Sequence, residues 1–143
     1  MKRILLLLLA FTLCFSFFAF AEGEITISVN SKPLTMDVPP EIVEGRTLVP
    51  MRAVFEALGA DVTWIGEEQM IIATSGSTII VLKIGASLLN YCDISSQENK
   101  NITLDVAPVS KDGRTLIPLR AVSEALGATV DWNGETRAIT ITK

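Results

Sequence analysis

The sequence contains no histidine, and this absence removes several kinds of chemistry at once. Imidazole activates serine and cysteine in hydrolase pairs, and it is a usual ligand of zinc and copper in proteins. The chain therefore has no Ser–His or Cys–His nucleophile pair and none of the usual zinc sites. We expect no catalytic residue, no metal site and no cofactor.

Cysteine is scarce as well, because the chain has only Cys14 and Cys92. Cys14 lies in an apolar N-terminal segment, so an intrachain disulfide is excluded if that segment is removed. The domain must then be stable through its core alone. We expect Cys92 to be buried as a small apolar residue, and an intermolecular disulfide is the alternative.

Long apolar runs are absent except at the N-terminus. Lys2 and Arg3 precede the uncharged stretch Ile4–Phe20, which ends in an Ala-Phe-Ala sequence at Ala21. This order of charge, apolar run and small residues predicts a secretory signal peptide of residues 1–21. An uncleaved membrane anchor and a lipid anchor on Cys14 are the alternatives, since the run is at the lower limit of a membrane span.

Positive charge is in short supply after this segment. Removal of residues 1–21 from the 143-residue chain leaves 122 residues, a size typical of one domain. Without Lys2 and Arg3 the formal net charge changes from −4 to −6. Such a chain is a poor partner for nucleic acid or for anionic membranes, so membrane contact is expected only through an uncleaved signal.

An internal repeat organises the remaining chain. Gly45–Ala60 reads GRTLVPMRAVFEALGA, and Gly113–Ala128 reads GRTLIPLRAVSEALGA, an offset of 68 residues without a gap. We interpret this as a duplication with units at about 25–76 and 77–143. Two units are too few for a solenoid, and each is short to fold alone, so we expect them to share one core.

Each unit contains one predicted amphipathic helix, Met51–Leu58 in the first and Leu119–Leu126 in the second. Both have apolar residues at helical spacing, a proline just before the start and a glycine just after the end. Ser123 in the second helix replaces Phe55 of the first. We therefore expect the second helix to be less deeply buried.

Short alternating segments predict strands around these helices. The result is an α+β fold in which a largely antiparallel β-sheet wraps on two short helices. Polar Asp93–Asn101 is expected to be an exposed hairpin tip or loop. The predicted strands are Ile25–Val29, Asp61–Trp64, Met70–Thr74, Thr78–Ile84, Thr129–Trp132 and Ala138–Thr142, and the corresponding segments Leu34–Val38 and Asn101–Val106 are extended lead-ins.

The repeated Gly-Arg-Thr-Leu-(Val/Ile)-Pro-(Met/Leu)-Arg-Ala-Val motif, the Glu-Ala-Leu-Gly-Ala helix end and the following Val-x-Trp resemble the copper amine oxidase N-terminal-like domain. The lead-ins Met36–Pro40 and Leu104–Pro108 match this pattern too. The resemblance covers nearly all of residues 25–143, and it assigns residues 22–143 to one such domain. It implies a module of secreted and cell-surface bacterial proteins, which in the oxidases is an accessory stalk remote from the active site.

The oxidases convert a tyrosine into a quinone within a Thr-x-x-Asn-Tyr-Asp/Glu motif, and Ser87–Asp93 around Tyr91 is similar to it. The segment departs from the motif at Ser87 and at Cys92. Because the quinone requires copper held by imidazoles, we interpret the similarity as coincidental.

Aromatic and acidic residues offer two further candidate sites. Trp64 and Trp132 could stack on sugar rings, but each ends an apolar strand, so we expect them to cap the core. Glu67, Glu68 and Glu135 could form a carboxylate pair for glycoside hydrolysis. They fall in predicted turns, where we expect solvated acids.

Charged residues retained in both units are a third candidate. Arg52 and Glu56 lie one helical turn apart and can pair. We favour a structural role for these residues, such as an arginine fork on a loop carbonyl, over polyanion binding. The retained residues are Arg46, Arg52 and Glu56, with counterparts Arg114, Arg120 and Glu124.

These observations predict an exported, non-catalytic structural or interaction module of the cell envelope or extracellular space, acting as a monomer or a dimer. Its partner would be a protein or a cell-wall polymer. A carbohydrate-binding module with exposed Trp64 and Trp132 is the alternative, with Arg52 and Arg120 as further candidate contacts. A small hydrolase that uses acids alone is the third hypothesis.

Overall fold

A computed structural model describes residues 23–143, which form thirteen strands and two helices. The predicted signal peptide, residues 1–21, lies outside the described residues. The helices are α1 (Met51–Ala57) and α2 (Leu119–Ala125). The strands are β1 (Thr26–Val29), β2 (Lys32–Pro33), β3 (Glu41–Val43), β4 (Arg46–Pro50), β5 (Asp61–Ile65), β6 (Met70–Ser75), β7 (Thr78–Lys83), β8 (Leu88–Asp93), β9 (Glu98–Thr103), β10 (Val109–Lys111), β11 (Arg114–Pro118), β12 (Thr129–Asn133) and β13 (Ala138–Thr142).

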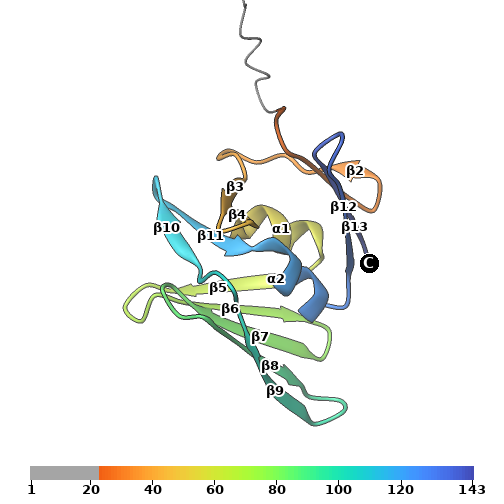
Figure 1. The fold of residues 1–143 in the computed structure, drawn as a ribbon. Coiled ribbons are helices and arrows are strands. Elements are labelled where there is room, and N and C mark those ends of the chain that lie inside the picture. Colours follow the sequence, from red (N-terminus) through yellow and green to blue (C-terminus); the bar gives the residue numbers. More distant parts are fainter. Residues whose placement is uncertain (1–22) are drawn as a thin grey trace, which may run out of the picture.

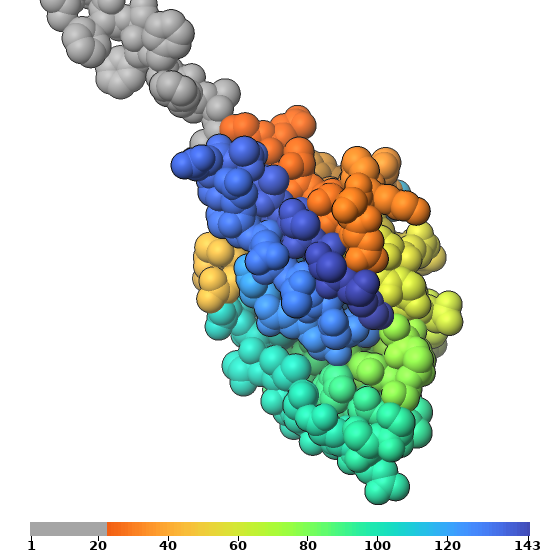
Figure 2. Space-filling view, turned by 90° about the vertical axis from the view of Figure 1, so that its right-hand side faces the viewer, coloured from red at the N-terminus to blue at the C-terminus, as the bar shows by residue number. Residues whose placement is uncertain are grey.

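The strands form three sheets instead of the single expected sheet (Figure 1). Their orders are β12-β13-β1-β2, β10-β11-β4-β3 and β5-β6-β7-β8-β9. We call the sheet β10-β11-β4-β3 the middle sheet and the other two the outer sheets. The expectation of antiparallel pairing holds for the five-stranded outer sheet and for the middle sheet, whereas in the other outer sheet β1 pairs with β13 in parallel. Figure 2 shows the consequence, since the N-terminal segment in orange lies beside the C-terminal segment in dark blue.

The two similar sequence segments adopt the same elements. The bounds of β3, β4, α1 and β5 recur 68 residues later as those of β10, β11, α2 and β12. In the middle sheet β4 pairs antiparallel with β11, and Val49 lies opposite Ile117, its own counterpart. The two segments therefore meet about an approximate two-fold axis at this pair of residues.

Both helices begin and end as the sequence predicts, apart from one residue at the end. Pro50 and Pro118 occupy the N-cap position, where the missing N–H costs nothing. Gly59 and Gly127 follow with φ of +72° and +85°, the left-handed conformation that glycine adopts without strain.

One apolar core is shared by the two halves, as expected. Val54 and Phe55 of α1 and Leu119 and Val122 of α2 belong to the same buried cluster, with side chains from the two outer sheets. The expectation of a shallower α2 is wrong, because Ser123 is 0 % exposed, as is Phe55. The backbone position determines this burial, since both residues lie on the helix face that points into the shared core.

Several strand bounds differ from expectation. Of the two expected lead-ins, Asn101–Val106 overlaps the end of β9 at residues 101–103, while Leu34–Val38 contains no strand. Six strands were not expected, because each is very short or lacks a clear alternation of apolar and polar residues: β2, β3, β4, β8, β10 and β11. The turn between β8 and β9 confirms the predicted exposed hairpin tip. Among the described residues no helix has the length and apolar character needed to cross a membrane.

Candidate ligand-binding groove

An open groove of about 1100 Å³ runs along α2. One wall is the exposed side of α2, with Arg120 and Glu124, and the other is the end of β9 with the segment that follows it. Trp132 and Tyr91 are its aromatic lining. The groove thus combines apolar surface with charged hydrogen-bonding groups, as small-molecule and polymer sites do.

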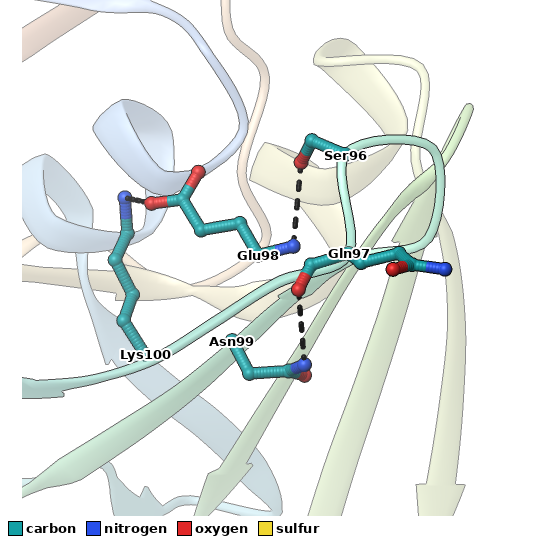
Figure 3. A network of polar contacts seen from close by, with 5 residues as sticks. All are labelled: Ser96, Gln97, Glu98, Asn99 and Lys100. Carbon is teal, nitrogen blue, oxygen red and sulfur yellow. Dashed lines mark hydrogen bonds and ion pairs between the residues drawn. The ribbon is translucent and has the colours of Figure 1, made fainter.

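The β8–β9 hairpin provides Tyr91 and Lys100, which are paired across the two strands. Lys100 Nζ lies 4.4 Å from the centre of the Tyr91 ring, in cation–π contact. It also donates to Glu98 Oε1 at 2.8 Å (Figure 3). This hydrogen bond raises the pKa of Lys100 above its usual value.

Arg120 is held on the wall formed by α2. Its Nη1 donates to the carbonyl oxygen of Val130 at 2.8 Å and lies 3.4 Å from Glu124 Oε1. The first contact is a single hydrogen bond to a carbonyl of strand β12, not the expected arginine fork on a loop carbonyl. The counterpart Arg52 makes no hydrogen bond or ion pair with any residue of 23–143, so the expected Arg52–Glu56 pair is not formed there.

Two arginines cross between the halves in a reciprocal way. Arg46 Nε donates to Asp105 Oδ2 at 2.7 Å, and Arg114 Nε donates to Asp37 Oδ2 at 2.6 Å. The two pairs are related by the 68-residue offset. Sequence reasoning identified the arginines but missed their partners, although Asp37 and Asp105 also recur at that offset.

The expectation that both tryptophans cap the core is wrong. Trp64 is 40 % exposed and Trp132 is 44 % exposed, and neither belongs to the buried cluster. Each is the next-to-last residue of its strand, β5 or β12, just before a turn. Only Trp132 lines the groove, because the groove follows α2 and not α1.

The remaining candidates do not gather at this site. Glu67, Glu68 and Glu135 are exposed turn residues, and none lines the groove. Cys92 is a free, half-buried residue of β8, not the fully buried thiol expected. Within residues 23–143 no group of three or more His, Cys, Asp or Glu side chains lies close enough to hold a metal ion.

Three sheets around two short helices, with a groove whose charged side chains are paired, define a small β-rich domain. The chain belongs to the copper amine oxidase N-terminal domain family, whose model matches residues 28–141. This confirms the resemblance read from the repeated motif. Domains of this family are typically non-catalytic accessory modules. A comparison with curated proteins finds no match.

Proposed function

We propose that this chain is an exported, non-catalytic interaction module of the cell envelope or extracellular space, which holds its ligand in the groove along α2. The groove supports this, because its size and mixed lining suit a segment of an extended polymer. Arg46, Lys100 and Arg120 are already paired with Asp105, Glu98 and Glu124. Because each cation is neutralised by its carboxylate partner, these side chains are suited to hydrogen-bond and orient an uncharged ligand.

A carbohydrate or wall polymer is the ligand that one observation favours. Trp132 presents an exposed indole in the groove, with Tyr91 further along it. A sugar ring stacks its C–H face on such an aromatic surface while its hydroxyl groups bond to polar neighbours. The acid-only hydrolase has less support, because the candidate acids lie outside the groove.

Binding can be tested with two matched variants, since Trp64 is the counterpart of Trp132 outside the groove. The ligands are soluble peptidoglycan fragments, added to the chain without residues 1–21, and isothermal titration calorimetry records the heat of binding. We expect Trp132→Ala to weaken binding at least about tenfold, the effect of losing an aromatic anchor, and Trp64→Ala to leave it unchanged. Equal effects of the two changes would place the binding elsewhere.

Export rests on the predicted signal peptide and needs its own measurement. The full chain is expressed with a tag at its C-terminus in a bacterial host, and the exported protein is sequenced from its N-terminus. We expect it to begin at Glu22, because cleavage follows Ala21. A product that retains Met1 in the membrane fraction would instead indicate an uncleaved anchor.

A further inference from the structure

The five-stranded sheet has one covered face and one open face. Ile71, Ile80 and Leu89 point into the core, and residues alternate with them along each strand. No described helix or strand covers the open side, and the two helices lie on the other (Figure 1). The open face consists of Asp61, Thr63 and Ile65 of β5, Met70, Ile72 and Thr74 of β6, Ile79, Val81 and Lys83 of β7, Leu88, Asn90 and Cys92 of β8, and Asn99, Asn101 and Thr103 of β9.

The other half of the molecule shows that this fold does not need an apolar residue at these positions. Inward-facing positions are apolar in both halves, as in Val62 and Val130. The outward-facing positions of β12 and β13 are polar or small where those of β5 and β6 are large and apolar. The pairs at the 68-residue offset are Ile65 and Asn133, Met70 and Ala138, and Ile72 and Thr140.

We propose that this open face docks a second copy of this chain. Its two charged residues, Asp61 and Lys83, support a self-complementary contact. Ile72 lies midway between these two residues. Asp61 lies on the neighbouring strand β5, opposite the position two residues after Ile72, and Lys83 lies on the other neighbour β7, opposite the position two residues before it. Consider a two-fold axis that runs between the two stacked sheets, passes over Ile72 and is perpendicular to the line from Asp61 to Lys83. This axis brings each Asp61 onto the partner's Lys83.

The size of the face is adequate for a dimer of modest affinity. Five strands spaced about 4.8 Å apart, each of about six residues at 3.3 Å, span about 24 by 20 Å. Two such faces bury roughly 960 Å² in flat projection, and the pleated accessible surface exceeds that value. This is close to the roughly 1000 Å² that is the lower limit for a specific interface, so we expect a weak dimer with a dissociation constant in the micromolar range.

The same symmetry places Cys92 on the axis. With these spacings the line from Ile72 to Cys92 makes about a right angle with the line from Asp61 to Lys83. Cys92 therefore faces the partner's Cys92. Stacked sheets lie about 10 Å apart, which is beyond the Cα separation that a disulfide spans, so a short bismaleimide is the suitable cross-linker.

The first test is sedimentation velocity on residues 22–143, which contain the whole core from Ile27 to Ile141, at about 1–200 μM. We expect a concentration-dependent dimer, and a monomer at all concentrations overturns the proposal. The triple change Ile65→Asn, Met70→Ala and Ile72→Thr transfers the residues of the other half. It should abolish the dimer while thermal unfolding stays cooperative, and a dimer of unchanged strength in this variant also overturns the proposal.

Charge reversal tests the geometry. In a dimer of either variant, Asp61→Lys or Lys83→Asp, residues 61 and 83 carry the same charge at both of their contacts. Each change alone should therefore weaken the dimer at least about tenfold. An equal mixture of the two variants satisfies both pairs and should restore it, whereas Asp131→Lys on β12 should have no effect. Failure of the mixture to restore the dimer overturns the two-fold arrangement.

Cross-linking tests the contact independently in the protein that keeps Asp61 and Lys83. A short bismaleimide should link two chains through Cys92, and the product should be lost in Cys92→Ser and in the triple variant. Equal yield in the triple variant would show random collision and would contradict the proposed contact.

Discussion

The two halves of the molecule agree where they face the core and differ where they face solvent. Val49 and Ile117 pair at the centre, and Val62 and Val130 both point inward. On the outside, Ile72 of the first half corresponds to Thr140 of the second. The comparison teaches that packing restricts inward positions in both halves, while outward positions are free to serve separate purposes.

The purposes differ in kind. The second half provides α2 and Trp132, which line the groove, whereas the first half provides β5 and β6 of the open apolar face. One deep position breaks the rule of inward agreement, because Phe55 corresponds to Ser123 and both are fully buried. The predictions below use this exception and the paired arginines to sharpen the comparison.

The largest expected effect is at Phe55. Phe55→Ser gives the first helix the residue of the second, and we expect a loss of about 3–5 kcal/mol in the free energy of unfolding because a large buried side chain leaves a cavity. Urea denaturation measures the loss, with Glu56→Ser on the exposed side of α1 as the control. A loss under about 1 kcal/mol would mean that the two helix positions are interchangeable.

Ser123 should respond in the opposite direction. Its hydroxyl is buried and has no hydrogen-bond partner among the described residues, which costs free energy in the folded state. We expect Ser123→Ala to raise the free energy of unfolding by about 1 kcal/mol, and exposed Ser110→Ala to leave it unchanged. Destabilisation by Ser123→Ala in urea denaturation would show that the hydroxyl is satisfied in solution.

Local features of the fold were predictable because local chemistry determines them. The helices follow from apolar spacing together with a proline before and a glycine after each one. The recurrence of the motif predicted a shared core. The burial of Ser123 was not predictable from its polarity, because the packing of both halves around the helix decides it.

Long-range features were beyond the sequence. The parallel pairing of β1 with β13 joins the two ends of the described chain, and no local pattern indicates it. The carboxylate partners of Arg46 and Arg114 had a signal in the repeat, yet their pairing across the halves required the two-fold arrangement.

The two helix arginines should differ in their contribution to stability. Arg120 donates to the Val130 carbonyl and pairs with Glu124, whereas Arg52 has neither contact among the described residues. We expect Arg120→Ala to lower the free energy of unfolding by about 0.5–1 kcal/mol, since its side chain is half exposed, and Arg52→Ala to change it little. Equal losses in urea denaturation would contradict the difference between the helices.

The smallest expected effect concerns the reciprocal ion pairs. Arg46→Gln and Arg114→Gln should each lower the melting temperature by at most about 4 °C, and by similar amounts, because both pairs are exposed and equivalent.

The Arg114 guanidinium lowers the pKa of Asp37 below its usual value of 3.8. A folded-state pKa below the unfolded one stabilises the protein above about pH 4, and this contribution is lost as the pH falls through the lowered value. The difference in melting temperature between the wild type and Arg114→Gln should therefore shrink from pH 6 to pH 2, and should also shrink in 1 M salt. Asp37→Asn in the Arg114→Gln background should add little to the loss, since the pair is already broken, and additive losses would show that the two side chains act independently.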